Sequence, residues 1–459
     1  MAGIGFELRR VIGKGGLSRS LGAALSGILI VAGPWLMTIL SFFFIRSIFS
    51  RSLASSADLF QVAVIYSYAV SISLFSGLHH HFTRIVADLI WEDRHAEASA
   101  WLVRFALAAA ALSVALGGTA MAVAPLDLGG GALAYRIACV FLFATVNVMW
   151  IVMLFVSLLR RYIAILAIFA AGMAASVFLV AAWGGRWGPA GALFGYATGH
   201  AFTAAGLLAL SFSRYTPAAI SGGWKFAMDY ARRYRALILS GFLFYLGQWS
   251  DKFVFWALRG SAVAGTPFRL YEAYDVPVYV AGLSIIPGLV YFVIYSETEI
   301  YASIRRFLNS LTHETLAHIF EAKERLGTDL RRELHDQTLF QLTFTFLAML
   351  LVLAREPDGA RRLVYLVALC GAFAQFTLMT LLNFLYYFEL YERSLVATAV
   401  FFIANGLVFP LVQLLLPGLP PGSGFLCAGI AASAAAWALL LQAVPDMDRR
   451  IFLRTVRRN

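Results

Sequence analysis

The residues best suited to binding chemistry lie in one stretch, Tyr245–Trp256, where aromatic rings and ionisable groups recur at helical spacing. One face of this predicted helix carries Tyr245, Trp249, Lys252, Trp256 and Arg259. Aromatic rings stack on the apolar faces of sugars, and amide and carboxylate groups bond hydroxyls, so Gln248 and Asp251 beside this face complete a surface that suits a sugar chain. The alternative is an interfacial belt, in which the tryptophans lie at the outer membrane surface and Lys252 reaches to water.

A second group of candidates lies along a tyrosine-rich apolar stretch. Its members are Asp275, Pro277, Tyr279, Pro287, Tyr291, Tyr295 and Glu297. Proline removes a helix hydrogen bond, so Pro277 and Pro287 predict a kinked helix whose tyrosines continue the binding path. Glu297 is expected at its cytoplasmic mouth, with an interfacial cap as the alternative. Gly33 and Pro34 predict a similar hinge in the first apolar segment, although proline is also tolerated in membrane helices without function.

Other residue types argue against metal, cofactor and enzyme chemistry. His79, His80 and His81 are consecutive and point about 100° apart on a helix, so we interpret them as interface histidines rather than metal ligands. No Asp or Glu lies between Asp127 and Asp229, so the first half lacks the buried acidic site expected of an ion-coupled drug antiporter. The sequence has no P-loop, nucleotide-binding unit or metal motif. We therefore expect no catalytic residues, no metal and no cofactor.

The chain contains twelve apolar stretches, each close to the ~20 residues that a helix needs to cross a bilayer. We expect these membrane helices to position the candidate residues. They lie at 21–45, 60–78, 103–124, 133–156, 163–183, 188–212, 236–258, 275–296, 338–354, 363–387, 394–416 and 423–444. Hydrophobic residues make up 61% of the chain and charged residues 13%, and the mean hydropathy is +0.77. Unpaired strands cannot exist in lipid, so the sequence predicts an all-α polytopic membrane protein.

The basic residues indicate how the spans are oriented. Successive loops lie on alternate sides of the membrane. Of the 36 Lys and Arg residues, 25 lie in the termini and loops of one side and nine in the loops of the other side. By the positive-inside rule both termini are cytoplasmic, which requires an even number of spans. The net charge of +11 therefore follows from membrane orientation and does not indicate nucleic acid.

Six spans precede a basic connector and six follow it, which predicts two six-helix bundles related by a pseudo-two-fold axis. The expected segments are an amphipathic cytoplasmic N-terminal segment (1–20), the first bundle (21–213), the connector (214–235), the second bundle (236–445) and a basic C-terminal tail (446–459). The outward loops are all short, so none could hold an extracytoplasmic catalytic domain.

A cytoplasmic helical insertion, residues 297–337, forms part of the second bundle and is expected to break near Gly327. From Arg305 to Asp336 it carries six basic and six acidic residues, a balanced surface rather than a polybasic lipid anchor. We interpret it as a docking platform for a cytoplasmic partner; the alternative is a solvated extension of the preceding span. The candidate docking residues are Arg305, Arg306, Glu321, Arg325, Arg331 and Arg332.

Four motifs resemble the PelG family, the inner-membrane transporters of Pel exopolysaccharide systems: Met1–Arg10, Ala32–Trp35, Gln248–Lys252 and Tyr295–Tyr301. The resemblance implies membership of the multidrug/oligosaccharidyl-lipid/polysaccharide exporter superfamily and two six-helix bundles in alternating access. It also implies a Gram-negative inner membrane, a polymer rich in N-acetylgalactosamine, and three partners. These are a PelF-like cytoplasmic glycosyltransferase, a PelD-like cyclic-di-GMP receptor and a PelE-like membrane protein. The candidate path residues come from the physical argument above and not from the resemblance.

We therefore expect a transporter that moves a growing, largely neutral polysaccharide through a path between the halves. A lipid-linked oligosaccharide flippase is the nearest alternative, and it requires a cluster of cations for the pyrophosphate beyond Lys252 and Arg259. A non-transporting scaffold for the polysaccharide synthase is a further alternative, supported by the insertion. A membrane-embedded glycosyltransferase is disfavoured, because the outer loops are too short to carry its acidic or His/Arg residues.

Overall fold

The computed structural model describes residues 54–159, 161–218, 223–443 and 445, together with positions 33, 36–41, 44, 45 and 47. Several expectations lie outside these residues: the N-terminal segment 1–20, the hinge proline Pro34, most of the first span and the tail 446–459.

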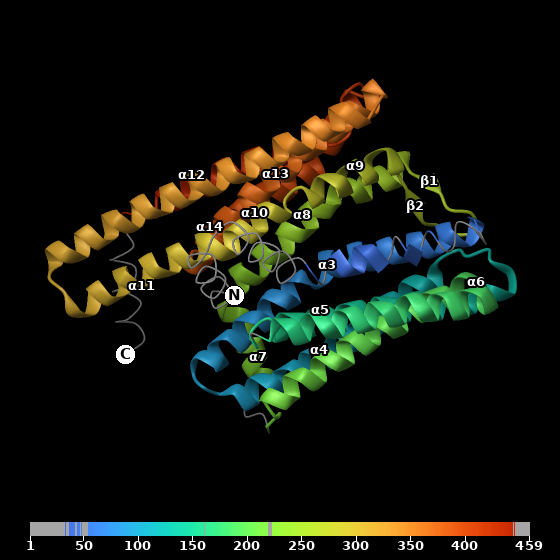
Figure 1. Cartoon of the computed structure of the whole chain (residues 1–459), viewed down its shortest axis with the longest axis horizontal. Helices are drawn as coiled ribbons and strands as arrows, with labels where there is room; N and C mark the ends of the chain where they lie inside the picture. The colour runs from blue at the N-terminus through green and yellow to red at the C-terminus, as the bar shows by residue number, and fades with distance from the viewer. Residues whose placement is uncertain are drawn as a thin grey trace, which may run out of the picture. The chain divides into compact units, whose positions relative to one another are not determined.

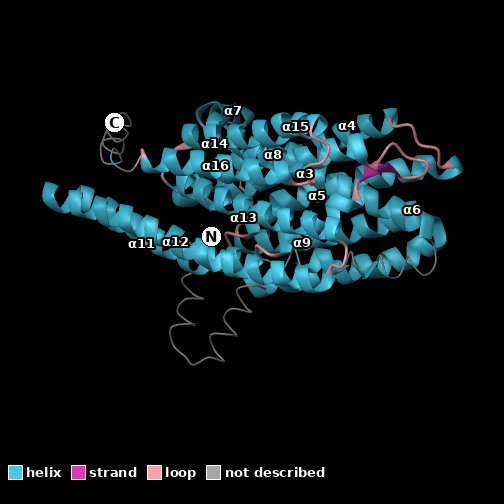
Figure 2. Ribbon diagram, turned by 90° about the horizontal axis from the view of Figure 1, so that it is seen from above, coloured by secondary structure: helices cyan, strands magenta, loops and turns pink. Residues whose placement is uncertain are grey.

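Almost all of the described chain is helical (Figures 1 and 2). The first helices are α3 (Ala54–Trp91), α4 (His95–Val123), α5 (Ala132–Val156), α6 (Tyr162–Arg214), α7 (Gly223–Arg233) and α8 (Arg235–Arg259). The later helices are α9 (Glu272–Leu283), α10 (Ile286–Tyr291), α11 (Glu297–His313), α12 (Leu316–Arg355), α13 (Gly359–Tyr387), α14 (Tyr391–Ile403), α15 (Phe409–Leu415) and α16 (Ser423–Leu441). Short elements are a 3-10 turn η1 (Gly129–Gly131), two π-helical segments, η2 (Phe292–Ser296) and η3 (Ala404–Val408), and the strands β1 (Ser261–Ala262) and β2 (Arg269–Leu270), which pair antiparallel.

The helices lie where the apolar stretches predicted them. Nine helical segments of the described chain are long and apolar enough to cross a membrane. One of these, α6, contains two spans, and α8 covers the predicted span 236–258, so eleven of the twelve predicted spans coincide with helices. The apolar pattern was sufficient here because each backbone group in lipid must be bonded within its own helix.

Helix α6 bends back on itself. Gly188 has φ +62°, Trp187 has φ −123°, and Pro189 follows, so the helical backbone is interrupted between the two spans. Glycines let the two halves approach closely: a Cβ at Gly199 would lie 2.6 Å from the backbone N and Cα of Ser176, and one at Gly195 would lie 2.6 Å from the carbonyl carbon of Leu179. The halves therefore pack antiparallel through small residues.

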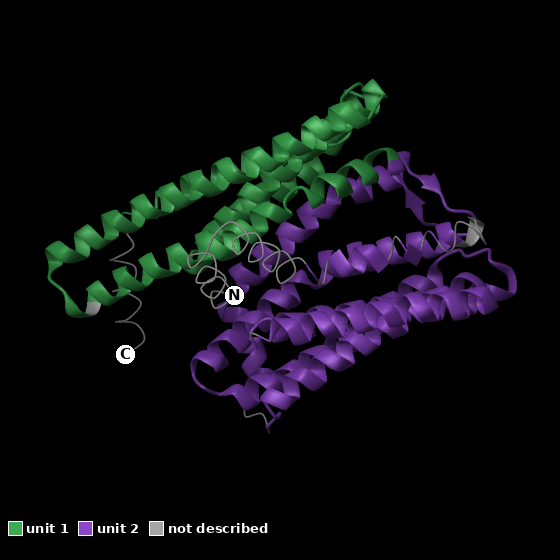
Figure 3. Cartoon of the chain, in the orientation of Figure 1, with its two compact units in different colours: residues 1–31, 273–459 green, residues 32–272 purple. Residues whose placement is uncertain are grey.

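The described residues form two compact units (Figure 3). The unit that ends at Glu272 is purple (unit 2 in the figure) and is called the first unit here, after its place in the chain; the unit that begins at Ala273 is green (unit 1 in the figure) and is called the second unit. In the first unit α4, α5 and α6 pack side by side, and α8 packs against α3. In the second unit α13 packs against α12 and α16. This boundary differs from the predicted connector 214–235, because α7 and α8 belong to the first unit. The two six-helix bundles remain a prediction.

Helix α7, within the predicted connector, is short and amphipathic. Phe226 stacks on Trp101 of α4 with ring centroids 5.6 Å apart, and the Ala227 carbonyl lies 2.8 Å from Nε2 of His81 on α3. Burial, together with Asp88 nearby, raises the pKa of Tyr230 to about 12. The helix is therefore held against the first unit by its apolar face.

The insertion 297–337 forms a helical hairpin of α11 and α12 that extends beyond α13 and α14 of the same unit (Figures 1 and 2). Phe307, Ile319 and Leu326 pack between the two helices. The expected break near Gly327 is wrong: α12 runs continuously through that residue, and the turn lies at 314–315. A single glycine costs only ~1 kcal/mol in a helix, which the surrounding helix and its packing offset.

We predict that Gly199→Ala destabilises the protein, because the added methyl group meets the backbone of Ser176, which cannot move independently of its helix. The expected cost is ~1–3 kcal/mol, measured as a lower midpoint of thermal unfolding in detergent. Gly185→Ala in the same helix is the matched control, since nothing lies within 4 Å of a Cβ there. Equal stability of the two variants would contradict close packing of the halves.

Candidate functional site

Two oppositely charged neighbours on α8 are buried in the first unit. Asp251 and Lys252 are each only 5% exposed. The Lys252 Nζ lies 3.0 Å from Asp251 Oδ1 and donates to the Gln248 carbonyl at 2.8 Å. Ionisable groups within membrane spans are costly to bury, so they mark functional sites by default. The pair carries no net charge, yet it offers hydrogen-bonding groups inside an apolar helix.

The aromatic residues of α8 do not all occupy the same environment. Trp256 is 3% exposed and stacks on Tyr66 of α3 with ring centroids 4.6 Å apart, so it belongs to the packed interior of the unit. Trp249 is half-buried, 6.3 Å from Trp256 between centroids. Tyr245 is also half-buried, and its ring lies 6.5 Å from that of His80.

Two further residues flank this group. Gln248 is half-buried and supplies the carbonyl that accepts from Lys252. Arg259, at the end of α8, lies with its guanidinium 5.8 Å from the centre of the Phe255 ring. The residues least enclosed by packing are therefore Tyr245, Gln248, Trp249 and Arg259.

In the second unit, the tyrosine-rich span is broken into short pieces. Helix α9 continues through Pro277, whereas the chain breaks at Ser284 and Ile285, just before Pro287 in the first turn of α10. The π-helical segment η2 then leads directly into α11 at Glu297. π-Helical segments inside α-helices occur frequently at functional sites.

The break is bridged by Gln341 of α12, a residue that sequence reasoning missed. Its Oε1 accepts from the Gly288 N–H at 3.1 Å, and its Nε2 donates to the Ser284 carbonyl at 3.0 Å. In an unbroken helix these two backbone groups would bond each other. Nε2 also donates to Thr345 Oγ1 at 3.1 Å, and the Gln341 side chain is fully buried. The sequence did contain a signal for Gln341: a glutamine inside an apolar span must find hydrogen-bond partners within the protein.

The tyrosines beyond the break contact each other and an aromatic ring of α12. Tyr291 stacks on Phe340 at 4.7 Å and lies 5.0 Å from Tyr295, measured between ring centroids. Tyr279, on α9, is 36% exposed. Glu297 is 5% exposed and lies within hydrogen-bonding reach of Tyr387 on α13. Glu297 is thus a buried carboxylate held against α13, rather than a solvated cap.

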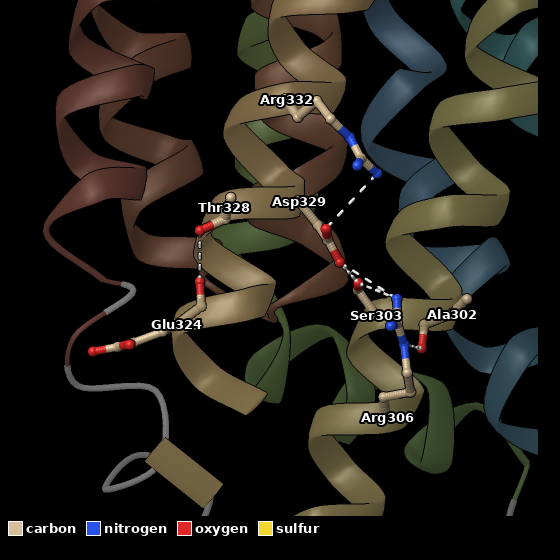
Figure 4. A network of polar contacts seen from close by, with 7 residues as sticks. All are labelled: Ala302, Ser303, Arg306, Glu324, Thr328, Asp329 and Arg332. Carbon is tan, nitrogen blue, oxygen red and sulfur yellow. Dashed lines mark hydrogen bonds and ion pairs between the residues drawn. The ribbon is translucent and has the colours of Figure 1, made fainter. Parts of the chain in front are cut away.

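The candidate docking residues lie on the α11–α12 hairpin, where charged groups form a network (Figure 4). Asp329 is its centre: it accepts from Ser303, pairs with Arg306 at 3.4 Å and with Arg332 at 3.8 Å. Arg325 pairs with Glu321 one turn away. Arg305 and Arg331 are exposed. A cavity of about 270 Å³ between the two helices is lined by Arg306, Asn309, Glu314, His318, Glu321 and Arg325, among others.

The three consecutive histidines contact different partners. His80 Nδ1 lies 2.9 Å from the Ser76 carbonyl, His81 bonds Ala227, and His79 lies beside Trp150. Among the described residues, no group of three His, Cys, Asp or Glu side chains could hold a metal ion.

Comparison with solved structures shows that the chain is a multi-pass membrane protein with the transporter fold of the MATE and MOP proteins. It matches a MATE transporter in the straight conformation with TM-score 0.64 and 13% identity, covering 93% of this chain and 96% of that one. It also matches the Vibrio cholerae MATE transporter VcmN in the bent form with TM-score 0.59 and 12% identity, covering 93% and 98%. A MOP superfamily transporter from Pyrococcus furiosus matches with TM-score 0.57 and 14% identity, covering 92% and 96%.

The family follows from the sequence itself. A family model described as "PelG: Putative exopolysaccharide Exporter (EPS-E)" matches residues 1–452. The chain therefore belongs to the PelG family of exopolysaccharide exporters, a transporter family and not an enzyme family. Comparison with curated proteins found no match.

We predict that Gln341→Leu destabilises the second unit, because it leaves the Gly288 N–H and Ser284 carbonyl without the amide that bridges them. An unpaired buried polar group costs ~1–3 kcal/mol, so the midpoint of thermal unfolding in detergent should fall. Thr343→Val on the exposed face of α12 is the control, with an expected change within about 0.5 kcal/mol. Full stability of Gln341→Leu would show that the break does not depend on the bridge.

Proposed function

We propose that this chain exports a nascent Pel-type polysaccharide, rich in N-acetylgalactosamine, from the cytoplasm to the periplasm across a Gram-negative inner membrane. The observation that carries the proposal is the PelG family match over residues 1–452, on a chain with a transporter fold. The chemistry of the candidate residues supports it. Half-buried Tyr245 and Trp249 on α8, and Tyr279 and Tyr291 in the broken span, offer rings on which sugars stack.

The balance of charges favours a neutral polymer over a lipid pyrophosphate. A flippase for lipid-linked oligosaccharides requires several cations to bind the pyrophosphate. Lys252 is already paired with Asp251 at 3.0 Å and with the Gln248 carbonyl, so its charge is compensated. Weak, repeated stacking contacts allow a polymer to slide, whereas tight sites would hold it in place.

The α11–α12 hairpin suits a docking role for a PelF-like glycosyltransferase, assembled with PelD-like and PelE-like membrane proteins. Helix α12 has 40 residues and is therefore ~60 Å long, about twice the ~30 Å of bilayer hydrocarbon. The hairpin carries charges of both signs, including exposed Arg305 on α11 and exposed Arg331 on α12. A docked synthase would deliver the polymer directly to the path.

We predict that Trp249→Ala lowers polymer export. Inverted inner-membrane vesicles that contain the chain and its glycosyltransferase complex are supplied with UDP-N-acetylgalactosamine, and polymer protected from an added hydrolase is measured. Loss of one stacking ring costs ~0.5–1.5 kcal/mol, so protected polymer should fall roughly two- to tenfold. Trp91→Ala is the matched control, because Trp91 is 88% exposed at the end of α3.

The buried pair is tested by the double variant Asp251→Asn, Lys252→Met, because removing one partner alone would leave an unpaired buried charge. The double variant should fold and assemble normally but export less polymer. Normal export by both this variant and Trp249→Ala would exclude α8 from the path and favour a scaffold.

We predict that Arg305→Glu combined with Arg331→Glu releases the glycosyltransferase. Reversal of two exposed charges repels a partner that is complementary to them, and it leaves the Asp329 network intact. The measurement is co-purification of the glycosyltransferase with the full chain. Arg355→Glu at the opposite end of α12 is the control, and undiminished co-purification of the double variant would place the docking surface elsewhere.

A further inference from the structure

An ionisable side chain outside the proposed path is fully buried in the first unit. His200 of α6 is 0% exposed, and its Nε2 lies 2.7 Å from the hydroxyl of Tyr68 on α3. Its Nδ1 lies 2.9 Å from the Tyr196 carbonyl, one turn earlier in α6. The Tyr196 ring packs on the imidazole with centroids 4.2 Å apart.

These contacts define the neutral tautomer of the ring. The Tyr196 carbonyl only accepts, so Nδ1 carries the hydrogen, and Nε2 of the neutral ring accepts from the Tyr68 hydroxyl. When a proton binds to Nε2, both nitrogens become donors. The Tyr68 O–H must then turn away, so that its oxygen accepts from Nε2. Protonation thus reverses the hydrogen bond that joins α3 to α6.

Among the described residues around His200, none carries a charge that would compensate an imidazolium. The titratable groups in its core are tyrosines and a thiol: Tyr68 from α3, Tyr196 from α6 itself, and Tyr135 and Cys139 from α5. Ser41 of the stretch 36–41 is uncharged. Among the described residues of this unit, the only buried carboxylate is Asp251 of α8, which is paired with Lys252.

Burial of an unpaired charge is costly, so this conformation favours the neutral ring. Any conformation in which His200 reaches water binds the proton more tightly. Proton binding therefore shifts the population toward that conformation.

Polar groups continue from His200 along the face of α3 that packs on α5. Ser71 donates to the buried Asn147 at 2.7 Å. Farther along, His79 is 7% exposed, and its Nε2 has no hydrogen-bond partner among the described residues. Tyr68 and His79 are eleven positions apart, about 16 Å along the helix. Chains of buried His and other polar groups are typical of proton pathways in membrane proteins.

We propose that His200 is a proton-binding site through which a proton gradient drives the conformational cycle of the transporter. The proton adds to Nε2, the Tyr68 hydroxyl rotates, and no other bond forms or breaks. The coupling of proton binding to polymer export rests on the proposed function, whereas proton binding by His200 does not.

The first test uses the same inverted vesicles with an acidic lumen, with and without an ionophore that exchanges K⁺ for H⁺. Wild-type export should fall severalfold when the pH gradient is collapsed, while total polymer synthesis persists. His200→Gln keeps an acceptor for Tyr68 but cannot bind a proton, so its export should be low and insensitive to the ionophore. His335→Gln, exposed on α12, is the control. A wild-type response to the ionophore in His200→Gln would overturn the proposal.

If wild-type vesicles protect no polymer, the proposed function is refuted, and proton binding by His200 is then tested separately by a second measurement. The same measurement applies if His200→Gln does not fold. Histidine-labelled full chain in lipid nanodiscs is titrated by NMR, and the His200 signal is assigned by comparison with Tyr68→Phe. The signal should move toward the imidazolium position as the pH is lowered below the ~6.5 at which an unperturbed histidine titrates. The pH of this change should differ in Tyr68→Phe, which lacks the hydroxyl that bonds Nε2 in both protonation states. An unchanged His200 signal in both proteins would overturn the proposal.

Discussion

The whole structure depends on one constraint: a polar group in the bilayer core must find its partner within the protein, because no water is available to bond it. Regular helix satisfies this requirement for most of the chain, so each interruption of a helix needs a specific compensation. At Gly188 the interruption lies between two spans, where the chain turns with positive φ. At Ser284 it is a side-chain amide from another helix, Gln341, which replaces a lost backbone bond with two of its own.

The same constraint requires each buried ionisable residue either to be paired with an opposite charge or to be uncharged. Asp251 and Lys252 neutralise each other, so they offer hydrogen bonds without a net charge that would trap a substrate. His200 is uncharged in this conformation and keeps both ring nitrogens bonded. The two arrangements differ in what they permit. The pair is already neutral as a whole and needs no change of protonation, whereas the imidazole changes its hydrogen bonds as soon as a proton binds.

Much of the fold could be predicted from the sequence, since hydrophobic length alone locates a membrane helix, and eleven of the predicted spans coincide with helices. The site was less predictable. Spacing correctly placed Asp251 beside Gln248 and Lys252, but it could not show that Trp256 is buried against Tyr66, because that contact depends on how α3 packs on α8. Prolines indicated a broken span, but the break lies only at Pro287. Gln341 and His200 were missed because the contacts that define their roles, with Ser284 and Gly288 and with Tyr68, join residues distant in sequence. Helical periodicity carries no information on such contacts.

Helix α12 forms one arm of the α11–α12 hairpin and also carries the side chain that bridges the broken span. It runs without interruption from Leu316 near the hairpin turn to Arg355, and Gln341 lies 25 residues from its start, ~37 Å along its axis. Because Gln341 is fixed to α12, a shift of this helix along its axis by one residue, ~1.5 Å, would stretch the hydrogen bonds to Gly288 and Ser284 beyond their normal length. The break in the tyrosine-rich span and the position of the hairpin therefore cannot vary independently. A partner bound to the hairpin, as we propose, would therefore act on the same helix that bridges the broken span.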